Sequence, residues 1–334
     1  MALRVRFVSS VIEVVDPVID YLSNGVSELD LFEPQYLIVP TAGVKAWLAP
    51  QIAARIGSTQ GNNDGVLMNV HIGYAGMLNK ILRGGITDED DLWSIENMTM
   101  VLLGILSNPV SEFSSLAVKH GGNLRAARAI ADRFDRYAAR RPSLIREWER
   151  AHKTNELLGS DNSHVEWQYA LWRQLRTQIG IPSWPARTAE LCTQLIKGEL
   201  PSHLPSKLMV AAMGTLSVSA IEILSALGTV IDVDVLCVNP SPYLSTEWAK
   251  QNPTVPVSLG HAPARNDDHH VLPEVDVLVS TWLRESYELQ MLLASQGIAY
   301  EPSSLKDSSS NSTSLLHRMQ SAIQQPNKVK AHPL

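Results

Sequence analysis

The chain has 334 residues, of which 45% are apolar and 19% are charged, and its formal net charge at pH 7 is −6. This length and composition predict a soluble globular protein with two domains, or with one large α/β domain that carries an insertion. The acidic balance excludes a generally basic coat for nucleic acid, although phosphate binding depends on where the positive charge lies.

Two further features favour a protein of the reducing cytoplasm. Cys192 and Cys237 are far apart and form no C-x-x-C pair, so the sequence indicates neither a disulfide framework nor a zinc site. No apolar run reaches the length of a membrane span, and Met1–Val8 lacks the long apolar region of a signal peptide. We therefore expect a cytoplasmic protein that has no membrane contact and no bound cofactor.

The first part of the chain predicts alternating strands and helices. Arg4–Val8 is expected to be a strand and Val11–Leu22 a helix. The next unit reads FEPQYLIVPTAGVKAWLAPQIAARIG at residues 32–57. It predicts a short buried strand at Tyr36–Val39, a turn, and an amphipathic helix that stops at Gly57.

This strand, turn and helix have the order by which P-loop proteins hold phosphate, because backbone N–H groups and a helix N-terminus together form an anion site. A P-loop, however, needs G-x-x-x-x-G-K-[ST], in which the lysine reaches the outer phosphates and the hydroxyl holds Mg²⁺. Here the turn has one glycine, Lys45 is displaced, and Ala46 stands where a hydroxyl should follow. The sequence therefore predicts a P-loop-like scaffold without ATP chemistry.

The middle of the chain predicts only helices. Val66–Val70 is expected to be a strand, and helical patterns then run from Tyr74 to about Leu200 without any strand-like alternation. We interpret this stretch as an all-helical insertion at residues 74–200.

Strands are expected again after the insertion. Lys207–Ala212 and Asp232–Val238 are predicted strands on either side of a helix at Ser219–Leu227, with Gly228 as its C-terminal cap. This β–α–β order favours a parallel sheet, because parallel strands need a crossover connection. We therefore predict one α/β domain built from residues 1–73 and 201–300.

Two segments in the last third are expected to be irregular. Residues 239–274 are proline-rich and long for an internal loop. Residues 301–334 are predicted to be a flexible, serine-rich linker with a stub helix at Leu315–Gln324.

The strongest charge feature is a basic helix at Leu124–Ala139, which continues after Pro142. Between Leu124 and Arg150 there are eight arginines and four acids, so this stretch is positive within an acidic protein. Arginine suits phosphate because its planar guanidinium bonds bidentately and stays charged.

Two alternatives for this region stay open at the level of sequence. The charged face of the helix can bind nucleic acid, or it can be a solvated surface whose arginines and acids pair at i, i+3 and i+4. The nearby tryptophans are either stacking surfaces for bases or part of the core: Trp148, Trp167, Trp172 and Trp184.

No catalytic motif is present in the sequence. It contains neither G-x-S-x-G nor H-E-x-x-H. A group of histidines and aspartates lies in the expected irregular loop, where no helix or strand fixes a ligand geometry, and we therefore do not predict a metal site there: His261, Asp267, Asp268, His269 and His270.

Several long segments together resemble the RecC family, the gamma subunits of exodeoxyribonuclease V, the RecBCD helicase–nuclease. They occur in the family's order across nearly the whole chain. The segments are FEPQYLIVPTAGVKAWL (Phe32–Leu48), ADRFDRYAARRPSLIREWE (Ala131–Glu149), LPSKLMVAAMGTLSVSAIEILSALG (Leu204–Gly228), DVDVLCVNPSPYLSTEW (Asp232–Trp248) and LVSTWLRESYELQMLL (Leu278–Leu293).

The resemblance implies a helicase-like fold that has lost its ATP site. It also implies a non-catalytic subunit that joins RecB-like and RecD-like motor subunits in a hetero-oligomer during double-strand-break repair by recombination. Such a subunit helps to split the duplex at a fork, lines the channel for the 3′-ended single strand, and in the best-known members scans for the Chi sequence. The family's members are several times longer, so the resemblance covers only their N-terminal part; a fragment, a truncated gene and a degenerate copy stay open.

Family positions that line this channel fall on the turn after the strand at Tyr36–Val39 and on the basic helix. Asp132, Asp135 and Arg141 stand at matching positions of that helix. The expected DNA-binding residues are Thr41, Lys45, Asp132, Arg133, Asp135, Arg136, Arg140, Arg141 and Arg187.

The chain departs from the family pattern at the turn and on the helix. Pro40, Ala42 and Ala46 stand where polar side chains are expected to read bases, whereas Arg133 and Arg136 make the helix more basic. We therefore expect binding to the strand backbone, with possible Chi-like scanning that reads a different sequence from the familiar Chi octamer, or none. The alternatives are an active nucleotide-dependent enzyme with an atypical phosphate loop, and a truncated structural protein without a DNA function.

Overall fold

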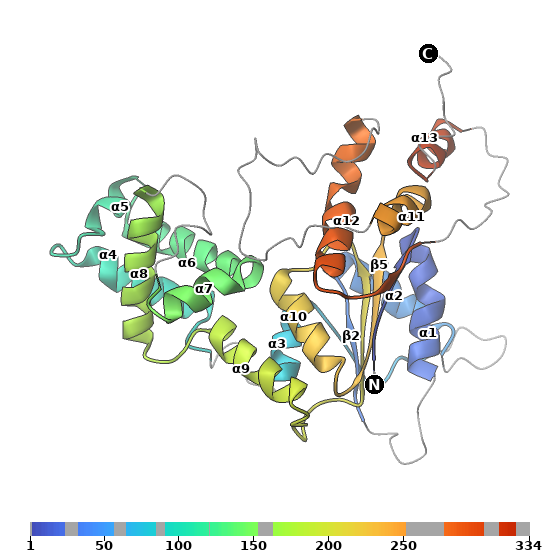
Figure 1. Cartoon of the computed structure of the whole chain (residues 1–334), viewed down its shortest axis with the longest axis horizontal. Coiled ribbons are helices and arrows are strands. Elements are labelled where there is room, and N and C mark those ends of the chain that lie inside the picture. Colours follow the sequence, from blue (N-terminus) through green and yellow to red (C-terminus); the bar gives the residue numbers. More distant parts are fainter. Residues whose placement is uncertain are drawn as a thin grey trace.

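A six-stranded, all-parallel sheet forms the centre of the chain in the computed structural model, with strand order β3-β2-β4-β5-β1-β6 (Figure 1). The strands are β1 (Leu3–Val8), β2 (Gln35–Ile38), β3 (Val70–Gly73), β4 (Lys207–Met213), β5 (Asp232–Val238) and β6 (Tyr300–Glu301). The structure describes residues 2–23, 33–56, 65–84, 91–119, 121–152, 163–251, 277–303 and 314–324. The predicted α/β fold with a parallel sheet is confirmed.

Helices cover both faces of the sheet, because its strands bury side chains on both faces. In β4, Leu208 and Val210 face one hydrophobic cluster, while Met209 and Ala211 face another. The first cluster includes residues of α3 (Gly76–Leu82), α9 (Trp184–Ile196), α10 (Val218–Leu227) and α12 (Val277–Ser295). The second includes residues of the 3-10 helix η1 (Val11–Val14), α1 (Val15–Ser23) and α2 (Ala42–Ala53). Figure 1 shows α1 and α2 on one side of the strands and α3 and α10 on the other.

A separate helical body lies beside the α10 face of the sheet (Figure 1). It consists of α4 (Ile95–Ser107), α5 (Ser114–Lys119), α6 (Asn123–Arg140), α7 (Pro142–Glu149) and α8 (Ser163–Ile179), which share their own hydrophobic cluster. The two helices that flank it in sequence, α3 and α9, place Leu82 and Leu195 in the core of the sheet. The exact division at residues 73/74 and 200/201 stays a prediction.

The order in which the chain connects neighbouring strands reverses between β2 and β4. The unit β2–α2–β3 leads toward one edge of the sheet with its helix on one face, and β4–α10–β5 leads toward the other edge with its helix on the opposite face. In α/β sheets, ligands bind in the crevice outside the carboxyl ends of such strands. The turn at residues 39–41 and the segment at 214–217 both lie at this position.

Two strand expectations were wrong in detail. The third strand is Val70–Gly73 rather than Val66–Val70, because Asn69 adopts a left-handed φ of 56° and its carbonyl accepts from Gln35 N at 3.0 Å, so pairing begins there. A sixth strand, β6, was not expected; it is only two residues long and has no pattern to detect.

The segment after β5 is also more regular than its prolines indicated. Pro242 begins α11 (Pro242–Gln251), a position where proline's missing N–H has no helical partner to lose. The expected stub helix is α13 (Leu315–Gln324), and its Ile323 packs against a small cluster with Leu244, Trp248 and Leu283. Residues 252–276, and with them the His and Asp group of the loop, lie outside the described residues.

Gly228 is the C-cap of α10, but it does not adopt the left-handed conformation for which a glycine is usually needed at this position. Its φ is −61°, a right-handed value that any residue can adopt. A Cβ built at this position lies 2.7 Å from Leu3 Cβ and 3.1 Å from Leu3 N. The glycine is therefore required by the close approach of the first strand.

We predict opposite effects for two glycine substitutions. Gly228→Ala is expected to lower the free energy of unfolding by about 1–3 kcal/mol, because its methyl group overpacks against Leu3. Gly104→Ala, at an exposed position inside α4 where no atom lies within 4 Å of the added Cβ, is expected to raise it by about 0.5–1 kcal/mol. Denaturant titration of both variants checks this, and two effects of the same sign would contradict it.

We also predict that Trp148 is essential to the helical body. Its ring is fully buried and lies 6.0–6.4 Å from the ring centroids of Phe134, Tyr137, Tyr169 and Trp172. Trp148→Ala is expected to cost about 3–5 kcal/mol of unfolding free energy. Trp282→Ala is the matched control, because 55% of that side chain is exposed; an equal loss in both variants would show that burial of Trp148 is not the cause.

Candidate nucleic-acid interface

The turn after β2 uses its own polar group to begin α2. Thr41 is the N-cap, and its hydroxyl accepts a hydrogen bond from Val44 N at 3.2 Å. Val39 N donates to Gly73 O at 2.9 Å, so the residue before the turn is still held to β3. Only Val39, Pro40 and Thr41 separate the strand from the helix, and Thr41, Ala42 and Gly43 are exposed.

Lys45 points toward the sheet in this structure. Its ammonium Nζ donates to the carbonyl of Ile72 at 2.9 Å. The carbonyls of Asn69 and Gly73 bond to β2 or to the residue after it. Because successive carbonyls of a strand point in opposite directions, the carbonyl of Ile72 faces away from β2. Among the described strands, β3 is an edge strand, and a lysine at such an edge is a common device against unwanted strand pairing.

The basic helix predicted at Leu124–Ala139 is α6, and it is strongly amphipathic. Its buried face contains Ala127, Ile130, Ala131 and Phe134 among others. Four arginines of its outer face are exposed and form no ion pair with another residue that the structure describes: Arg125, Arg133, Arg136 and Arg140. From Arg125 to Arg140 the helix rises about 22 Å at 1.5 Å per residue. We call these four side chains the α6 arginine row.

The acids of α6 are placed differently from one another. Asp132 pairs with Arg128 at 3.4 Å, and Arg128 also bonds to Glu96 at 3.2 Å, so this part of the helix has the i, i+4 pairing that the solvated-surface alternative predicts. Asp135 is half-buried. Burial raises the pKa of its carboxyl, the neighbouring Asp132 raises it further, and Arg136 opposes the shift. Arg141 lies at the junction of α6 and α7 and is half-buried.

The tryptophans of this region belong to the core. Trp148 and Trp172 are buried, and Trp167 and Trp184 pack against the same cluster. Tyr137 is half-buried and donates its hydroxyl to Gln168 Oε1 at 2.9 Å. These rings therefore do not supply an exposed stacking platform beside the α6 arginine row.

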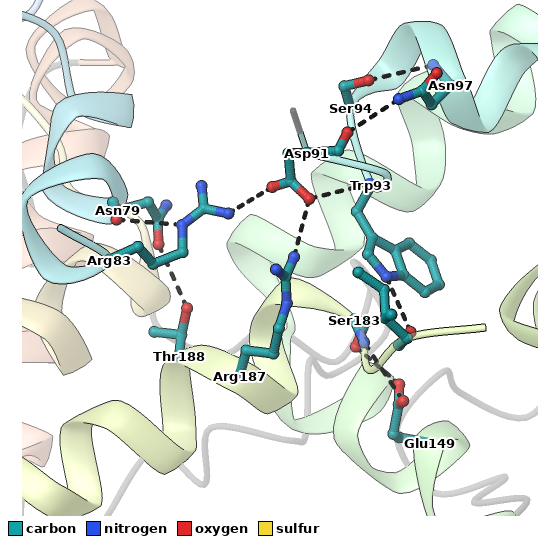
Figure 2. A network of polar contacts seen from close by, with 11 residues as sticks. Asn79, Arg83, Asp91, Trp93, Ser94, Asn97, Glu149, Ser183, Arg187 and Thr188 are labelled. Carbon is teal, nitrogen blue, oxygen red and sulfur yellow. Dashed lines mark hydrogen bonds and ion pairs between the residues drawn. The ribbon is translucent and has the colours of Figure 1, made fainter. Parts of the chain in front are cut away.

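Arg187 lies apart from the α6 arginine row, in a cluster of polar contacts around Asp91. Figure 2 shows the Asp91 carboxylate between the guanidinium groups of Arg83 and Arg187, at 2.5 and 2.9 Å. The same carboxylate accepts from Trp93 N at 3.1 Å. Burial alone would raise the pKa of the Asp91 carboxyl, but the hydrogen bonds from Arg83, Trp93 N and Arg187 outweigh it, and the pKa lies below its usual value.

The structure therefore places the predicted residues in three locations rather than in one cluster. Thr41 and Lys45 lie at the start of α2, six residues lie on or directly after α6, and Arg187 lies at the junction of the helical body with the sheet. The α6 helix contacts α10, on the face of the sheet opposite to α2.

The sequence predictions omitted Arg125 from the DNA-binding set and did not find the Asp91 cluster. A stricter use of helical spacing would have added Arg125, since it lies on the same face as Arg133 and Arg136. Nothing in the sequence pairs Asp91 with Arg187, because the two residues are 96 positions apart.

No helix within the described ranges is long and apolar enough to cross a membrane. Within the same ranges, no three His, Cys, Asp or Glu side chains are grouped so that they could hold a metal ion.

Comparisons with known proteins identify the family. The family model described as "RecC, N-terminal domain" matches residues 11–326. The RecBCD enzyme subunit RecC of Mycolicibacterium smegmatis is 28% identical over 298 residues, covering 82% of this chain and 24% of that protein. The RecC subunit of Mycobacterium tuberculosis (strain CDC 1551 / Oshkosh) is 26% identical over 247 residues, covering 67% of this chain and 22% of that protein.

The RecC subunit of Escherichia coli (strain K12) is 24% identical over 253 residues, which cover 70% of this chain and 21% of that protein. The chain thus spans less than a quarter of the length of these curated relatives. Because the family model matches nearly the whole chain, the chain belongs to the RecC family and corresponds to its N-terminal domain.

Proposed function

We propose that this chain is a non-catalytic, DNA-binding scaffold of a RecBCD-type helicase–nuclease that acts in double-strand-break repair by recombination. In this role it lines the channel for the 3′-ended single strand and contacts RecB-like and RecD-like motor subunits at a DNA fork. The observation that carries the proposal is the α6 arginine row in a chain of the RecC family.

The electrostatics of α6 support binding to the strand backbone. Arg133, Arg136 and Arg140 follow one another at i, i+3 and i+7, so they lie on one face, and none of them forms an ion pair with a described acid. A row of this kind neutralises successive phosphates, and binding then depends strongly on salt. Lys45 and Arg187 are part of the proposed set, but each already bonds within the protein, so they must change partner to contact DNA directly.

The same surfaces offer little for reading bases. The turn exposes Ala42, Gly43 and Ala46, which have no side-chain donor, and the Thr41 hydroxyl already caps α2. The tryptophans near α6 are in the core. Asp132 and Asp135 are the carboxylates of the proposed set, and carboxylates can accept hydrogen bonds from base amino groups. We therefore propose that sequence discrimination is weak and that the familiar Chi octamer is not read.

The alternative of an active nucleotide-dependent enzyme finds little support in the geometry. Three residues connect β2 to α2, fewer than a P-loop needs between its strand and helix. Lys45, the nearest lysine to the turn, donates to Ile72 O rather than toward the turn. We also propose that the sheet belongs to a helicase-like domain with a degenerate P-loop. The reversal of the strand order between β2 and β4 supports this assignment.

We predict that Arg133→Ala, Arg136→Ala and Arg140→Ala together weaken single-strand binding and reduce its salt dependence. Three lost phosphate contacts lower the slope of log K against log salt by about 2, since each contact on a single strand contributes about 0.7. Fluorescence anisotropy with a labelled single strand at several salt concentrations measures both effects.

The matched control removes three positive charges elsewhere, by Arg55→Ala, Lys250→Ala and Arg284→Ala, all at exposed ion pairs. This control is expected to keep most of the salt slope. Equal losses in the two variants would show that overall charge, and not the α6 arginine row, determines binding.

We also predict that Lys45→Met does not alter interaction with Mg·ATP, because the wild-type chain is expected to show no saturable binding by equilibrium dialysis. The variant is expected to lose about 1 kcal/mol of unfolding free energy, since Ile72 O loses its donor. Saturable ATP binding that the substitution abolishes would revive the enzyme alternative.

A further inference from the structure

The hydrophobic cluster on the α10 face of the sheet and the cluster of the helical body are separate, and one buried carboxylate lies between them. Leu78, Ile81 and Leu82 of α3 belong to the core of the sheet, whereas Trp93 and Met98 belong to the helical body. Asp91 lies between these two groups in sequence and in space. We propose that Asp91, Arg83 and Arg187 form a buried charge lock that fixes the orientation of the helical body relative to the sheet and thereby positions the α6 arginine row.

The lock joins three separate elements. Arg83 follows α3, Arg187 lies in the first turn of α9, and Asp91 lies just before α4 (Figure 2). The backbone carbonyl of Asp91 also accepts from Asn97 Nδ2 at 3.2 Å, and Ser94 caps α4 by accepting from Asn97 N at 3.2 Å. The direction of α4 is therefore tied to the same residue that binds both arginines.

The burial of these charges makes their geometry selective. The side chains of Arg83 and Asp91 are only 8% and 9% exposed, and that of Arg187 is 23% exposed. A buried charge without its partner is strongly unfavourable, so any rotation of the helical body that separates Asp91 from either arginine is disfavoured. Apolar packing alone is less directional, because different packings of similar side chains differ little in energy.

Two further sets of polar contacts act at the same junction. Arg146 of α7 bonds to both carboxylate oxygens of Glu222 in α10, at 2.9 and 3.0 Å. Glu149 at the end of α7 pairs with Arg176 and accepts from Ser183 Oγ at 2.8 Å, directly before α9. These contacts hold α7 against α10 and against the segment before α9, whereas the Asp91 lock holds the start of α4.

The consequence for DNA rests on the proposed function. The α6 helix contacts α4 within the helical body and α10 on the sheet, so a helical body that turns also moves the α6 arginine row relative to the carboxyl edge of the sheet. In this account Asp91 contacts no DNA and acts as a positioning residue. Arg187 then contributes to the interface by holding Asp91.

The test separates orientation from stability with an apolar lock. Asp91→Leu, Arg83→Met and Arg187→Met together remove all three charges, and such replacements are often neutral for stability. Arg187→Gln is a milder second variant that keeps the pair of Arg83 and Asp91. The control is Arg284→Met with Glu288→Leu, which removes an exposed ion pair.

Spin labels on introduced cysteines report the distance between the helical body and the sheet. The labelled positions are Ala129 of α6 and Gln51 of α2, which are both exposed, and both native cysteines are buried.

Pulsed electron resonance on the full chain is expected to give one narrow distance distribution for the wild type and the control. The apolar triple variant is expected to lose this narrow distribution while its melting temperature stays within a few degrees of wild type, and Arg187→Gln to lie between them. The affinity of the apolar triple variant for a single strand is expected to fall about tenfold, a usual size for coupling between sites.

A narrow distribution in the triple variant and in Arg187→Gln would overturn the lock. A broadened distribution with unchanged DNA affinity would overturn the positioning of the α6 arginine row. Unchanged DNA binding in the arginine-row variants, with an intact narrow distribution, would overturn the proposed function alone, so the two failures are distinguishable.

Discussion

Asp91 lies where the core of the sheet and the core of the helical body meet, and its carboxylate accepts from Arg83, Arg187 and the N–H of Trp93. A carboxylate at this depth is stable only while these donors stay in place. The orientation of α4, α9 and the end of α3 is therefore constrained together. Because α6 packs on α4, the same constraint extends to the surface that carries the α6 arginine row.

The phosphate-loop-like turn has the position of a ligand site without its chemistry. It lies at the carboxyl end of β2, where the sheet changes direction and ligands bind in related folds. Thr41 uses its hydroxyl to cap α2, and Lys45 uses its ammonium to bond the outer carbonyl of β3. The polar groups that would serve a phosphate thus stabilise the scaffold of this RecC-family chain.

Much of the fold was predictable because its signals are local. The apolar runs of β2, β4 and β5 and the amphipathic pattern of α6 gave elements within a few residues of those observed. The miss at β3 depends on a distant residue, because pairing begins after Asn69, whose carbonyl bonds to Gln35. Gly228 is the predicted C-cap of α10, but the reason for a glycine there is the distant Leu3. The exposure of Arg125, Arg136 and Arg140 followed from helical spacing, whereas the partners of Lys45 and Arg187 come from other elements and leave no trace in local sequence.

The proposed function requires that single-stranded DNA lies along the outer face of α6. Photocrosslinking can detect this contact, with a photoreactive residue at Ala129, which is exposed between Arg125 and Arg133 and leaves every arginine in place. The matched position is exposed Gln51 of α2, on the opposite face of the sheet. Crosslinks to a single strand are expected from position 129 and should decline as salt rises, and few are expected from position 51. Equal crosslinking from both positions, or none from position 129 under conditions where DNA binds, would contradict it.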